Sequence, residues 1–61
     1  MKVGDLVQYR YPETDDERGI GVVISKTNHP GFFEIMELVG QYRGDTHVDN
    51  NDLWEVISES R

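Results

Sequence analysis

Three side chains with metal-ligand chemistry alternate along one short segment. Asp45, His47 and Asp49 are each separated by one residue, so in an extended segment all three project from the same face. Carboxylate oxygens and an imidazole nitrogen are donors that divalent metals accept. The sequence offers no side chains to orient such ligands, and a polar edge that discourages pairing with other chains explains the same alternation. We therefore predict no metal site.

A second charged group is the acidic stretch 13–17. Its carboxylates belong to Glu13, Asp15, Asp16 and Glu17. A solvated loop is the default explanation, since connecting segments are polar. The alternative is functional: four carboxylates create a negative potential that steers a basic partner toward this surface.

Aromatic and large apolar side chains are the remaining candidates for binding. Trp54, together with Tyr9 and Tyr11, forms either part of the core or a groove for a partner; we favour Trp54 as the cover of one end of the fold. Phe32 and Met36 lie on one face of an extended segment. That face is exposed if its alternate neighbours fill the core, and such a stripe is typical of an interface with a partner or a second copy.

Enzyme chemistry has little support in the sequence. There is no P-loop, no GxGxxG and no recognisable context for a Ser/His/Asp arrangement. Cysteine is absent, which excludes disulfides and thiolate zinc sites and fits an intracellular protein. We expect no enzyme, no catalytic residue and no cofactor.

The central structural element is expected at residues 19–26. Its run of Val and Ile favours a strand. Ile20, Val22 and Ile24 share one face and Val23 points to the other, so the strand has apolar residues on both faces. Such a strand is expected in the middle of a small sheet.

Four more strands and two turns complete the prediction. The Pro30-Gly31 pair predicts a type II turn. The third strand has two mixed faces, and we expect Phe33 and Ile35 to point inward. The predicted strands cover residues 6–11, 32–38, 46–48 and 53–57, with a 3₁₀ turn at 49–52. Residues 1–61 thus predict one all-β domain, a five-stranded antiparallel small barrel with a 3₁₀ turn before the last strand.

Charge and hydropathy limit the partners. Twelve acidic residues against six basic ones give a net charge of −6, which repels phosphate backbones. No apolar run approaches the roughly 20 residues of a membrane span, and the N-terminus lacks the apolar core of a signal peptide. We expect a protein partner and neither nucleic acid nor membrane.

The order of three motifs resembles that of a known fold family. GDLV at 4–7, GIGVV at 19–23 and DLWEVI at 52–57 resemble the corresponding parts of SH3-like small β-barrels, including KOW-like and Tudor-like variants. The closing motif with its SES tail resembles short proteins of bacteriophages, notably marine cyanophages. The resemblance covers nearly the whole chain.

Three uses of this fold bear on the function. The resemblance to SH3 domains implies that Tyr9, Tyr11, Trp54 and the acidic stretch bind a proline-rich peptide carrying a basic residue, although the paired tryptophans of those domains are absent. A Tudor-like use implies an aromatic cage for a methylated cation, with Tyr42 as a further member. A KOW-like use implies contact with RNA or with transcription or ribosomal proteins, and requires the basic residues Arg10, Lys26 and Arg43 to cluster.

The function expected from the sequence is a small, acidic, non-enzymatic protein-binding module. The resemblance implies that a phage encodes it and that it acts on a host or virion protein, in the host cytoplasm or in the virion. Two alternatives stay open. One is a KOW-like module associated with nucleic acid or the transcription and translation machinery; the other is a self-assembling minor virion component, for which a homo-oligomer would complete a thin core.

Overall fold

The protein is an antiparallel all-β domain. The computed structural model describes residues 1–11, 19–40 and 42–60. Its five strands are β1 (Leu6–Tyr9), β2 (Ile20–Lys26), β3 (Phe32–Val39), β4 (Thr46–Asn50) and β5 (Trp54–Ser58), and a 3₁₀ helix (Asn51–Leu53) lies just before β5. The predicted five strands and the 3₁₀ turn before the last one are therefore confirmed. No α-helix occurs within these described ranges.

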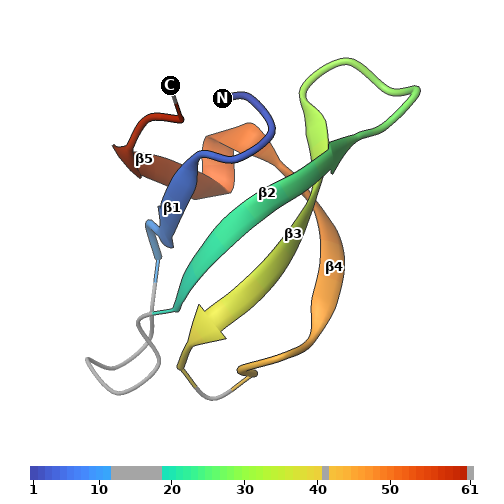
Figure 1. Cartoon of the computed structure of the whole chain (residues 1–61). Coiled ribbons are helices and arrows are strands. Elements are labelled where there is room, and N and C mark those ends of the chain that lie inside the picture. Colours follow the sequence, from blue (N-terminus) through green and yellow to red (C-terminus); the bar gives the residue numbers. More distant parts are fainter. Residues whose placement is uncertain (12–18, 41, 61) are drawn as a thin grey trace.

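The strand order is β4-β3-β2-β1-β5, as Figure 1 shows. The first four strands follow one another as a meander, and the chain then returns to pair β5 with β1. The predicted central position of the second strand is confirmed. Among the described residues β4 and β5 remain the two edges, so backbone pairing does not close the sheet. The arrangement is compatible with a small SH3-like barrel that is left open at one seam.

The boundaries differ from the predicted ones by one or two residues at several ends. The 3₁₀ helix lies at Asn51–Leu53 because the Asn50 side chain caps it, accepting a hydrogen bond from the Asp52 N–H. The last strand accordingly begins at Trp54. At the same end of the sheet, the Phe32 N–H donates to the His29 carbonyl, and Gly31 has a φ of +82°. These two features confirm the predicted type II turn.

The core lies on one face of the curved sheet. Its buried apolar side chains are Val7, Val23, Ile35 and Trp54. Val23 pairs directly with Ile35, so both point to the same face. Phe33 packs against this cluster from the same side of β3, which confirms the predicted inward pair on that strand.

Gly21 allows β2 and β3 to approach closely under this core. It is buried, and a Cβ at this position would lie 2.7 Å from Ile35 Cγ2 and 2.8 Å from the Met36 carbonyl oxygen. The second contact is with backbone, which cannot move aside without disturbing the ladder. A glycine in a strand interior here marks close backbone approach.

Gly21→Ala is expected to destabilise the fold by about 1–3 kcal/mol, because the added methyl overpacks the core. Urea unfolding followed by tryptophan fluorescence measures this loss. Unchanged stability would show that Ile35 does not lie against the β2 backbone as described.

Asp5 fastens the two ends of the chain to each other. Its buried carboxylate accepts a 2.7 Å hydrogen bond from the Ser60 N–H and a 2.9 Å bond from the Lys2 N–H. The termini therefore lie side by side in Figure 1. The Ser60 bond is the main reason that the pKa of Asp5 lies below its ordinary value; burial opposes this, while the Lys2 N–H and the charges of Lys2 and the N-terminus support it.

Asp5→Asn is expected to lower the midpoint of urea unfolding at neutral pH. Because the pKa of the folded state is depressed, the ionised Asp5 stabilises the fold above the unfolded-state pKa, and this stabilisation is lost as the pH falls through the folded-state pKa. The difference from wild type should therefore shrink toward strongly acidic pH. Asp52→Asn, at an exposed aspartate, is the matched control and should change little at either pH.

Candidate functional site

A carboxylate lies on the core side of the sheet. Glu37 continues the inward alternation of Phe33 and Ile35 along β3, and it is only 5% exposed. It pairs across the sheet with Gly21. The neighbouring Gly19 also makes room for it, since a Cβ on Gly19 would collide with Glu37 Oε1. Gly19 thus provides the space that the carboxylate occupies.

Two side chains of β4 point to the same face. His47 pairs with Ile35, and Asp49 pairs with Phe33. His47 Nε2 lies 3.7 Å from Glu37 Oε2 and 4.0 Å from Asp49 Oδ2. The register of β3 and β4 therefore brings one imidazole between two carboxylates.

Trp54 connects this group to the opposite edge strand. Its indole Nε1–H donates a 2.9 Å hydrogen bond to Asp49 Oδ2, and its ring meets the His47 ring edge-to-face at a centroid distance of 5.9 Å. Asp49 belongs to β4 and Trp54 to β5. Side chains thus bridge the seam that backbone pairing leaves open. We call Glu37, His47, Asp49 and Trp54 the seam cluster.

The seam cluster contains two buried polar atoms that no described residue satisfies with a hydrogen bond. Glu37 Oε2 and His47 Nε2 are buried, and neither has a hydrogen-bond partner among the described residues. Burial is the main reason that the pKa of Glu37 lies above its ordinary value. His47 acts in the opposite direction, and the Asp45 and Asp49 carboxylates add to the rise. A buried polar atom without a partner requires an explanation in a folded protein.

The alternating Asp45, His47 and Asp49 lie in different environments. Asp45 is exposed and precedes β4, whereas His47 and Asp49 turn toward the core face. In the part of the chain that the structure describes, no three His, Cys, Asp or Glu side chains are placed to hold a metal ion. Sequence reasoning did not join Glu37 to this group. The sequence did contain one sign of it: Glu37 alternates with the inward-pointing Phe33 and Ile35, on a face where a charged side chain is unexpected.

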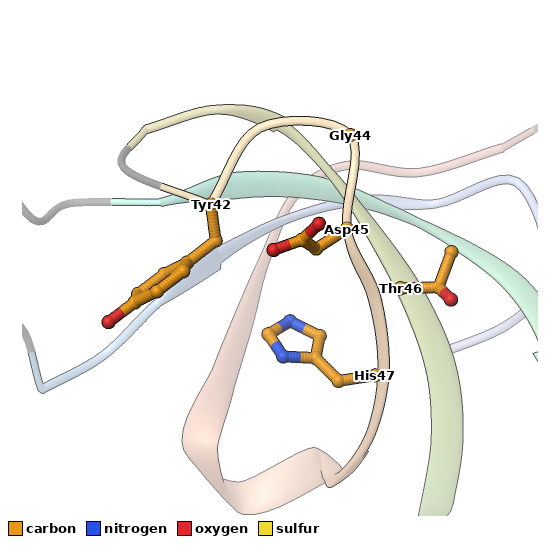
Figure 2. Close-up of a pocket in the computed structure, with 5 residues that line it drawn as sticks. All are labelled: Tyr42, Gly44, Asp45, Thr46 and His47. Carbon is orange, nitrogen blue, oxygen red and sulfur yellow. The ribbon is translucent and has the colours of Figure 1, made fainter.

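A polar hollow lies beside the seam cluster. It encloses about 530 Å³ and is lined by Tyr42, Gly44, Asp45, Thr46 and His47. Figure 2 shows the Asp45 carboxylate and the His47 ring facing the same space, with the Tyr42 ring at one side. None of the hydrogen bonds among the described residues joins two of these side chains.

The predicted aromatic binding residues form a series from core to surface. Trp54 is only 2% exposed, and Tyr9 packs edge-to-face against it at 5.3 Å. Tyr11, 63% exposed, meets Tyr9 at 6.4 Å. Trp54 thus belongs to the core, and Tyr11 is the member of this series that reaches solvent most. The four predicted acidic residues Glu13, Asp15, Asp16 and Glu17 lie outside the described residues.

The other predicted pair, Phe32 and Met36, lies on the outer face of the sheet. Met36 pairs with Val22, which pairs in turn with Leu6. The three half-buried side chains form a continuous cross-strand row, which we call the outer apolar row. Phe32, 39% exposed, points to the same face from the end of β3. Apolar side chains therefore cover part of both faces of the sheet.

Acidic side chains flank the outer apolar row. Glu34 faces outward on β3 opposite Val48, and Glu55 faces outward on β5 opposite Gln8. The basic residues do not gather in a comparable way. Lys26 pairs with Phe33 near one end of β3, whereas Arg43 lies in the loop beyond its other end.

Comparison with known proteins gives no relative for this chain. No protein-family model, no curated protein and no solved structure matches it. No helix within the described ranges is long and apolar enough to cross a membrane.

Trp54→Phe is expected to lower the free energy of unfolding by roughly 2 kcal/mol, because it removes the indole donor and leaves Asp49 without this bond. Thermal or urea unfolding followed by circular dichroism measures the loss. Asp49→Asn is the matched variant: it keeps an oxygen that accepts the indole N–H, so its loss should be smaller. Equal stability of Trp54→Phe and wild type would contradict the described bridge.

Proposed function

We propose that this chain is a non-enzymatic protein-binding module whose partner docks on the outer face of the sheet. The observation that supports it is the outer apolar row of Leu6, Val22 and Met36, which continues across three neighbouring strands. Side chains on this face that extend the apolar surface include Phe32 and Leu38, both 39% exposed. Contiguous exposed apolar surface is typical of interaction sites.

The charges beside the row indicate the chemistry of the partner. Glu34 and Glu55 flank it, and the whole chain carries a net charge of −6. A partner with an apolar centre and a rim of Lys and Arg would complement this surface. Its opposite charge would speed association and lose effect as salt rises.

A protein is favoured over nucleic acid by the placement of the basic residues. Affinity for nucleic acid comes largely from Lys and Arg that contact successive phosphates. Lys26 pairs with Phe33 near the start of β3, whereas Arg43 lies in the loop that follows its end, so most of the length of this eight-residue strand separates them. The resemblance to phage proteins supports a host or virion protein as the partner.

The test compares three forms of the tagged protein as bait in nuclease-treated host lysate: wild type, Met36→Glu and Val3→Glu. Met36 lies in the outer apolar row, and Val3 is an exposed apolar residue before β1. A charge in the row should weaken capture of the specific partner at least about tenfold, as expected for a central interface residue. Val3→Glu should retain the partner.

Three results would overturn the proposal. One is a partner captured equally well by Met36→Glu, which would place binding elsewhere. Another is recovery that depends on nucleic acid and disappears with nuclease. The third is a stable dimer of the purified chain in sedimentation analysis that Met36→Glu dissociates, which would assign the row to self-association.

A further inference from the structure

We infer that Glu37 and His47 form a proton-controlled latch that holds the seam between β4 and β5 closed and releases it as the pH rises. The two atoms that face each other, Glu37 Oε2 and His47 Nε2, are 3.7 Å apart. Both are buried without a hydrogen-bond partner among the described residues. A proton on the imidazole nitrogen converts this unsatisfied contact into an ion pair.

The surroundings of His47 decide which charge state favours closure. Its neighbours include the carboxylates of Glu37 on β3, Asp49 on β4 itself and Asp45 in the preceding loop. From β5 it meets only the uncharged Trp54 ring, and Tyr42 shares the hollow with it. An imidazolium at this position therefore has carboxylates on several sides.

Loss of that proton leaves the Glu37 charge buried, with no hydrogen-bond partner for Oε2 among the described residues. Glu37 is only 5% exposed. The backbone of Gly19 lies beside its carboxylate, and Gly21 is its partner across the β2–β3 ladder. Removing one partner of a buried ion pair is destabilising because the other charge remains desolvated. The least costly relief is local opening of the seam, which admits water to Glu37 without unfolding the sheet.

The pH range of the latch follows from its two groups. Imidazole is the side chain that ordinarily changes charge between pH 5 and 8. Burial raises the pKa of Glu37, so the closed seam favours the protonated form of this carboxyl group. A raised folded-state pKa means that this stabilisation is present at low pH and lost as the pH rises. The seam is therefore expected to be closed in acid and loosened toward alkaline pH.

Trp54 reports directly on the seam. It is the only tryptophan of the chain, and its Nε1–H donates to Asp49 across the seam. The experiment measures solvent exchange of this indole proton by NMR from pH 5 to pH 8, normalised to free N-acetyltryptophanamide at each pH. The protection factor of the wild type should fall several-fold over this range, because local opening exposes the indole to solvent.

Glu37→Gln is the decisive variant, because its neutral amide needs no imidazolium and can donate to His47 Nε2. Its indole protection should stay constant over the same range. Glu59→Gln is the matched control: it makes the same chemical change at an exposed residue after β5 and should retain the wild-type profile.

A second variant covers the case in which Glu37→Gln does not fold. His47→Gln supplies a permanent amide donor in place of the imidazolium, so its indole protection should also lose its pH dependence. The inference is overturned if the normalised wild-type protection is constant from pH 5 to pH 8. It is equally overturned if the folded Glu37→Gln or His47→Gln protein keeps the wild-type profile.

Discussion

The rest of the structure is arranged around a carboxylate on the core side of a very small sheet. Glu37 is buried on the same face as the four buried apolar side chains of the described residues. Gly19 leaves the space that its carboxylate occupies, and among the described residues His47 faces it across the β3–β4 ladder. Burial of a charge is costly unless the charge is paired. The strands around Glu37 must therefore leave room for its carboxylate and place a partner beside it.

The open seam is the second consequence of this arrangement. A barrel closed by backbone hydrogen bonds would pair β4 with β5, but within the described residues these strands remain edges. The Trp54–Asp49 hydrogen bond and the Trp54–His47 ring contact connect them instead. These side-chain contacts are fewer than the hydrogen bonds of a backbone ladder, and their strength depends on the charge state of the groups that make them. The edge that contributes the buried Trp54 to the core is thus also the edge whose closure we propose to respond to protonation.

The two faces of the sheet have different roles. The inner face contains the core and the seam cluster, while the outer face presents the row of Leu6, Val22 and Met36 with acidic neighbours. A chain of 61 residues has too few apolar residues to spend many on a second face without consequence. The outer row is therefore the part of the surface that the proposed binding function uses, and it lies across the sheet from the proposed latch.

Local patterns in the sequence determined the strands, the Pro30-Gly31 turn and the inward position of Ile35, because side-chain alternation and turn chemistry act over a few residues. The central place of β2 followed from apolar residues on both of its faces. The partnership of Glu37 with His47 and the burial of Trp54 against β4 depended on register and on the return of β5 beside β1. Asp49 and Trp54 lie five residues apart and Glu37 and His47 ten, but local patterns do not fix the register of β3 against β4 or the path of the chain into β5, so only the tertiary structure decides that these side chains meet.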